Sequence, residues 1–224
     1  LGATALGFYQ MPYRLSNMPA TEITHVVSQV TFPAYSQLQD NLPKLREAYL
    51  KTLQLTAFIS IPLAGGIFML GPEFTRIFLG DKWMPMIPAM QALCIFGVTR
   101  SINATLGPLF QGMGEPGVMT KASGIQLMIM ATVIYPFTIR WGVVGTSLAV
   151  IIPNLFVMVY LSARIADMAK FKSATAYQCL FSPMLGTVIM SFLILVLQNR
   201  MIESNLVGLF ASAVIGIAVY FGAI

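Results

Sequence analysis

The chain has 224 residues, of which 57% are hydrophobic and only 9% are charged, and its mean hydropathy is +0.77. An average soluble domain is about 25% charged, and it needs those side chains to cover its surface. The composition therefore excludes a soluble globular domain and favours a protein whose solvent is the lipid bilayer.

Long intervals of the chain contain no ionisable side chain. They are close to the ~17–25 residues that a helix needs to cross a hydrocarbon layer of ~30 Å. They do not alternate polar and apolar residues as transmembrane β-barrel strands do. We therefore predict an all-α, polytopic transmembrane helix bundle. Its seven expected spans are residues 7–33, 50–71, 86–112, 119–139, 142–164, 176–198 and 204–224.

The two ends of the sequence suggest a longer protein. The N-terminus has no initiator Met, no basic segment and no cleavage site of the kind that marks a signal peptide. Leu1 is therefore expected to be an internal residue, and Ile224 falls inside the last apolar span. We expect the chain to be a transmembrane domain fragment.

The first expected span, residues 7–33, carries three ionisable side chains in an apolar segment. At 3.6 residues per turn its polar side chains form one stripe, with Glu22 and Gln29 beside it. The opposite side includes Ala20 and Val30 and is expected to face lipid, so the stripe should face protein or water. The stripe consists of Arg14, Asn17, Thr21, His25 and Ser28.

Charges inside the hydrocarbon cost about 2.5–3.5 kcal/mol each and usually line a wet cavity. Arg14 and Glu22 are roughly 12 Å apart along a helix and cannot pair with each other. Glu22 and His25 are one turn apart, close enough for a hydrogen bond. Two other interpretations remain open: Arg14 extends to the headgroups, or Glu22 and His25 form a structural pair between helices.

A second stripe lies in the span 86–112, where Arg100, Asn103, Gly107 and Gln111 recur every three or four residues. Arg100 is more than a dozen residues from its nearest charged neighbours in sequence, so reaching the membrane surface would be difficult. Two arginines in one cavity favour an anion, since guanidinium groups bind phosphate through paired hydrogen bonds. A lipid with a pyrophosphate head is one such ligand.

Lysine and arginine are distributed unequally between the two sets of loops. The positive-inside rule places the richer set in the cytoplasm. This bias and anionic headgroups explain the net charge of +5 without nucleic acid. The richer set holds Lys44, Arg46, Lys51, Lys121, Arg164, Lys170 and Lys172, and the other set holds Arg76, Lys82, Arg140 and Arg200.

The sequence offers no sign of catalysis, of a metal site or of a cofactor. Cys94 and Cys179 lie in separate apolar spans without metal-ligand spacing. The loop acids are scattered, although a membrane transferase would typically cluster acids around Mg²⁺. We therefore expect that the chain is not an enzyme and needs no metal or cofactor.

Several segments together resemble the bacterial polysaccharide biosynthesis transporters. They read "LGFYQMPYRLSNMPATEITHVVSQVTFPAYSQLQ", "LREAYLKTLQL", "GPEFTRIFLGDKWMPMIPAMQAL", "GPLFQGMGEPG" and "RWGVVGTSLAV". The resemblance covers residues 1–165 and fades in the last two spans. The combination is specific to this group, which flips lipid-linked oligosaccharides for O-antigen and exopolysaccharide and shares a superfamily with multidrug and toxic-compound antiporters.

The resemblance implies a two-lobed exporter of the bacterial inner membrane, with this chain forming most of the second lobe. Its implied partners are the missing N-terminal lobe, membrane lipids and a polysaccharide polymerase. The implied substrate is an undecaprenyl-diphosphate-linked oligosaccharide for O-antigen, exopolysaccharide or capsule. Arg14 and Arg100 match the cationic cavity residues of such flippases, with Asn17, Asn103 and Gln111 beside them. Glu22 and His25 are the candidates for ion coupling.

Other functions remain open. A multidrug antiporter or a peptidoglycan-precursor flippase belongs to the same superfamily, although exporters of organic cations prefer acidic cavities. A structural subunit without transport activity is a further possibility.

Overall fold

The computed structural model describes residues 3–168, 173–200 and 206–223. These residues contain helices and no strand, which confirms the predicted all-α fold. Their helices are α1 (Ala3–Leu38), α2 (Leu42–Phe74), the π-helical turn η1 (Thr75–Leu79), the 3₁₀ turn η2 (Asp81–Met86), α3 (Ile87–Gly112), α4 (Pro116–Met168), α5 (Ser173–Arg200) and α6 (Leu206–Ala223).

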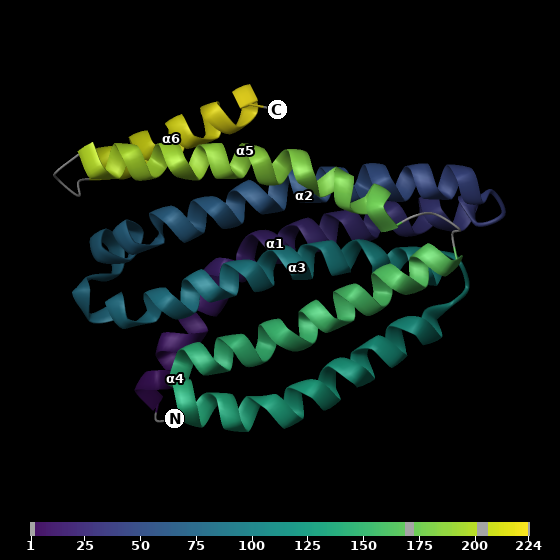
Figure 1. The fold of residues 1–224 in the computed structure, drawn as a ribbon, viewed down its shortest axis with the longest axis horizontal. Helices are drawn as coiled ribbons and strands as arrows, with labels where there is room; N and C mark the ends of the chain where they lie inside the picture. The colour runs from purple at the N-terminus through teal and green to yellow at the C-terminus, as the bar shows by residue number, and fades with distance from the viewer. Residues whose placement is uncertain (1–2, 169–172, 201–205, 224) are drawn as a thin grey trace.

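The helices form an elongated bundle with α1 and α3 near its middle (Figure 1). α2 runs along one side of this pair and α4 along the other. α5 and α6 lie beyond α2 and pack almost entirely on α2 and on each other. Two polar side chains fasten them there, since Tyr220 donates to the main-chain oxygen of Phe58 (2.7 Å) and Gln198 to that of Met69 (3.4 Å).

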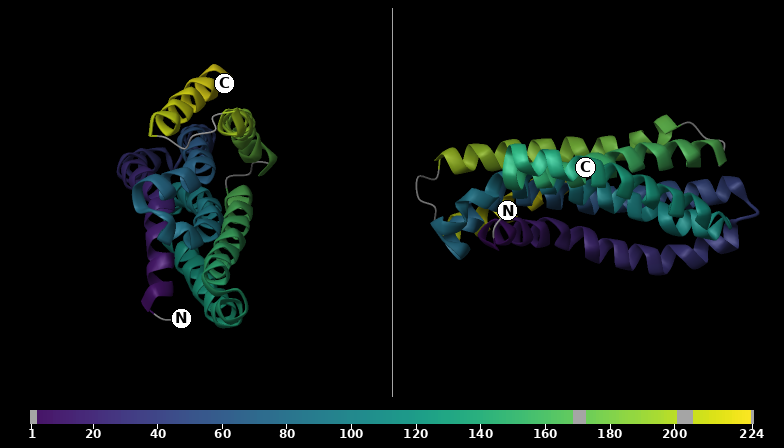
Figure 2. Two further views of the ribbon diagram at one scale, coloured as in Figure 1. Left: turned by 90° about the vertical axis from the view of Figure 1, so that its left-hand side faces the viewer. Right: turned by 90° about the horizontal axis from the view of Figure 1, so that it is seen from below.

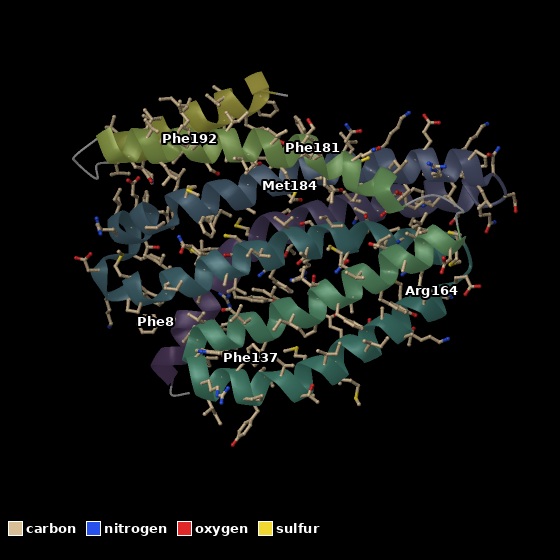
Figure 3. The ribbon with its side chains drawn as sticks, in the orientation of Figure 1. Phe8, Phe137, Arg164, Phe181, Met184 and Phe192 are labelled. Atoms are coloured by element: carbon tan, nitrogen blue, oxygen red, sulfur yellow. The ribbon has the colours of Figure 1, made fainter. Side chains whose placement is uncertain are left out.

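The outer surface of the bundle is apolar, as a bilayer requires. Phe181, Met184 and Phe192 of α5 are 66%, 55% and 68% exposed and point away from the bundle (Figure 3). Four helical stretches of the described residues are long and apolar enough to cross a membrane, and α6 is a shorter apolar helix. The chain is therefore a multi-pass membrane protein, and the count of seven spans stays a prediction.

α4 is a helical hairpin, because its backbone reverses at Gly142. This residue has φ 56° and ψ −130°, a conformation that essentially only glycine adopts. Across the turn the hydroxyls of Thr138 and Thr146 are 3.0 Å apart. A Cβ atom on Gly145 would overlap the main-chain oxygen of Phe137. The two limbs of α4 therefore meet backbone to backbone at this end.

Small side chains let α1 and α3 approach closely. The Ser16 hydroxyl donates to the main-chain oxygen of Met90 (3.1 Å), and the Cys94 sulfur lies 3.8 Å from the same hydroxyl. A Cβ atom added at Gly97 would lie 2.8 Å from the main-chain oxygen of Ser16. Packing of small residues is the main source of helix association in lipid, so this contact fixes the central pair.

We predict that Gly97→Ala destabilises the full-length protein by about 1–3 kcal/mol, the usual cost of overpacking. The added methyl meets backbone, which cannot rotate away as a side chain can. The free energy of unfolding is measured by SDS titration in mixed micelles. Gly107→Ala is the matched control on α3, where the nearest side-chain atom would lie at an ordinary 3.8 Å.

The control should keep or gain stability, because alanine favours helix by about 1 kcal/mol over glycine. Equal stability of the two variants would show that α1 and α3 are not held by this close approach.

Candidate functional site

Arg100 extends from α3 to α1 in the middle of the bundle. Its Nη1 atom lies 3.4 Å from the Tyr13 hydroxyl and 3.5 Å from Asn17 Oδ1. Both acceptors are neutral and both distances are long. A guanidinium has five N–H donors, and Arg100 forms no ion pair within the described part of the chain. The half-buried Arg100 therefore keeps an uncompensated positive charge and spare donors.

Asn17 is the partner that orients Arg100. Only 3% of Asn17 is exposed, and its amide nitrogen donates to the main-chain oxygen of Tyr13 at 2.9 Å. That bond turns the amide oxygen toward the guanidinium. The structure thus brings two of the predicted site residues, Asn17 and Arg100, together across the α1–α3 contact.

Asn103 pairs with a residue that the sequence alone does not single out. Its amide nitrogen donates to both the main-chain oxygen (3.3 Å) and Oδ1 (3.1 Å) of Asn154 on α4. The Oδ1 atom of Asn103 is buried and has no hydrogen-bond partner among the residues that the structure describes. One signal in the sequence could have identified Asn154, because it is an amide directly after Pro153 in an uncharged span. A proline in a membrane helix leaves a backbone carbonyl without its helical donor, and polar side chains of neighbouring helices can satisfy it.

Arg14 and Glu22 are both exposed on α1, on a surface that no described helix covers. Neither forms a hydrogen bond or ion pair with the residues that the structure describes. Gln111 is exposed at the end of α3. His25 belongs to α1, but its side chain lies outside the described residues.

The polar stripe of α1 therefore divides between two environments. Asn17 is buried against α3, whereas Arg14, one turn earlier, is exposed. The expectation that the opposite side faces lipid as a whole was wrong, because Ala20 is 2% exposed while Val30 is 68% exposed. The cause is that α1 packs on two helices, α2 and α3, and so buries a wider arc than one stripe.

An apolar groove of about 530 Å³ lies on the other side of Arg14 from Asn17. Helices α1, α2, α5 and α6 form most of its wall, Met90 of α3 adds to it, and neither arginine lines it. Met18, which does line it, is one turn after Arg14, and residues four apart are neighbours on a helix surface. Representative lining residues are Met18, Leu63, Ile194 and Ile217.

The first part of the chain matches a known protein family. Residues 1–88 match the family described as "Polysaccharide biosynthesis protein". A Klebsiella pneumoniae protein, "Uncharacterized membrane protein in cps region", is 28% identical over 68% of this chain. The Escherichia coli K12 "Lipopolysaccharide biosynthesis protein WzxC" is 26% identical over 69% of it. The chain spans about a third of these relatives, 31% and 32% of their lengths.

A solved structure extends the similarity to the whole fold. The "Lipid II flippase MurJ, inward closed conformation" superposes with a TM-score of 0.75 at 20% sequence identity. The superposition covers 98% of this chain and 44% of that one. The predicted resemblance is thus confirmed: this multi-pass membrane chain is similar in sequence to bacterial polysaccharide biosynthesis proteins and shares the fold of the MurJ structure.

Proposed function

We propose that the chain forms part of a flippase that moves undecaprenyl-diphosphate-linked oligosaccharide across the bacterial inner membrane. The glycan would serve O-antigen, exopolysaccharide or capsule synthesis. The observation that carries this proposal is Arg100, a cation in the middle of a membrane helix bundle without a carboxylate partner in the described residues.

An anionic ligand would explain why this charge is kept. A charge at this depth costs about 2.5–3.5 kcal/mol by insertion scales, and two long bonds to neutral oxygens compensate it poorly. A diphosphate offers acceptors in the planar arrangement that guanidinium binds best. Arg14 carries a second positive charge on the neighbouring, exposed side of α1.

The apolar groove supports a lipid as the carrier of that anion. It is lined by aliphatic and aromatic side chains, and one of its lining residues, Met18, is one turn from Arg14. An isoprenoid chain in this groove and a diphosphate at the arginines would occupy adjacent sites on α1. A soluble phosphorylated ligand would have no apolar chain to bind in the groove.

A transport pathway would also need a second lobe opposite this chain. The chain matches 44% of the MurJ structure, which supports the proposal that it supplies most of one lobe and that an N-terminal lobe supplies the other. A polysaccharide polymerase that receives the glycan is a further proposed partner. Glu22 and His25 stay as predicted candidates for ion coupling.

The similarity to a lipid II flippase favours one second candidate, a peptidoglycan-precursor flippase. Such a substrate also has a polyprenyl diphosphate, so the arginines and the groove fit both. The sequence relatives favour the first proposal, because one of them is named for lipopolysaccharide biosynthesis. A multidrug antiporter fits less well, since organic cations would be repelled by Arg14 and Arg100.

We predict that Arg100→Ala in the full-length protein lowers surface polysaccharide by about tenfold or more. This is the scale expected when charge-assisted hydrogen bonds are lost. Immunoblotting of surface polysaccharide measures the effect, and membrane fractionation verifies insertion. Arg164→Ala is the control, because Arg164 is an exposed arginine at one end of the bundle (Figure 3). Normal polysaccharide in Arg100→Ala would rule out the anion-binding role.

Arg14 and Arg100 should respond differently to lysine. Arg14 makes no hydrogen bond with the described residues and would act as a point charge, so Arg14→Lys should keep most of the activity that Arg14→Ala loses. Arg100 bridges two acceptors through its planar group, so Arg100→Lys should lose nearly as much as Arg100→Ala. The same polysaccharide assay measures all four variants. Equal loss in Arg14→Lys and Arg14→Ala would instead show that Arg14 binds through its paired N–H groups.

A further inference from the structure

A ladder of aromatic rings leads away from Arg100. The Tyr13 ring, whose hydroxyl faces the guanidinium, lies 6.0 Å from the Phe96 ring at an angle of 31°. On its other side the Tyr9 ring lies 5.7 Å away at 32°. Phe96 is buried, whereas Tyr9 and Tyr13 are half-buried. The ladder therefore begins in the core of α3 and ends at Tyr9 on α1.

This ladder lies at the end of the bundle where the N-terminal part of α1 and the α4 hairpin extend past α3. Figure 2 shows these two segments on two sides of α3. Phe8 and Phe137 lie at the same end of the two arms (Figure 3). A buried cluster joins α3 to α4, and Tyr9 and Tyr13 pack against it. The cluster consists of Leu93, Phe96, Val150 and Ile151.

Tyr9 has unused binding capacity. Tyr13 is its only ring contact among the described residues, and within them its hydroxyl has no hydrogen-bond partner. Because Tyr9 is only half-buried where it packs against the cluster, part of its ring and its hydroxyl remain accessible to a ligand. Sugar rings present C–H groups on one face and hydroxyls at their edge, and aromatic residues with a polar tip offer both matching surfaces.

We infer that Tyr9, at the outer end of this aromatic ladder, is a stacking surface for the sugar ring attached directly to the diphosphate. This inference rests on the proposed function, because it takes Arg100 as the diphosphate site. The spacing fits, since Tyr9 and Tyr13 are four residues or ~6 Å apart along the helix. The first sugar is bonded to the diphosphate and so must lie about one ring's width from it, where this aromatic pair begins.

The test compares two lipid probes that differ only in the sugar. Full-length protein in nanodiscs is titrated with undecaprenyl diphosphate and with undecaprenyl diphosphate bearing one hexose. Tyr9→Leu should weaken binding of the sugar-bearing probe by about 3- to 10-fold, the scale of an aromatic stacking contact. It should leave binding of the bare probe unchanged. Tyr9→Phe, which keeps the ring, should bind both probes nearly as the unaltered protein does.

Two further variants separate the possible failures. Arg100→Gln should weaken binding of both probes, and no effect on either probe would overturn the anion site and, with it, the sugar position inferred from that site. Tyr9→Met retains an apolar side chain for packing. Equal loss of both probes in Tyr9→Leu and Tyr9→Met would assign the ring to packing and overturn the inference. Unchanged binding of the sugar-bearing probe in both variants would overturn it as well.

Discussion

The close approach of α1 and α3 is the constraint on which the rest of the site depends. Gly97 and Ser16 bring the two backbones together, and Arg100 follows Gly97 by one turn of the same helix. Its guanidinium therefore reaches Tyr13 and Asn17 across the contact. A wider separation would leave the charge among apolar side chains, where it could not be kept. The small residues therefore determine the position of the Arg100 charge as well as the packing of α1 on α3.

Three kinds of surface meet on the first half of α1. One side carries aromatic rings and the Asn17 amide, the next exposes Arg14, and the third borders an apolar groove. A ligand with a sugar, a diphosphate and an isoprenoid chain has the same three parts, joined in the same order. A single helix can present all three because side chains three and four residues apart share a face while their neighbours do not.

The sequence was sufficient for the fold class, because uncharged runs of this length leave few alternatives to membrane helices. It also singled out Arg100, which the structure places half-buried between α3 and α1. It could not identify the partners of that cation, since periodicity gives the face of one helix and not the helix opposite. For this reason Asn17 and Arg14 were assigned to one stripe although only Asn17 is buried. Asn154 and the groove arise from contacts between distant segments, which no local pattern contains.

The attachment of α5 and α6 has a mechanical consequence. These helices pack almost entirely on α2 and each other, and they form one wall of the groove. Arg100 is held separately, by the α1–α3 pair. A rotation of α5 and α6 about α2 would widen or narrow the apolar groove without moving Arg100. Contacts between the groove and a hydrocarbon tail would then change independently of the contacts between Arg100 and an anionic headgroup. The two parts of a long amphiphile would be released one after the other.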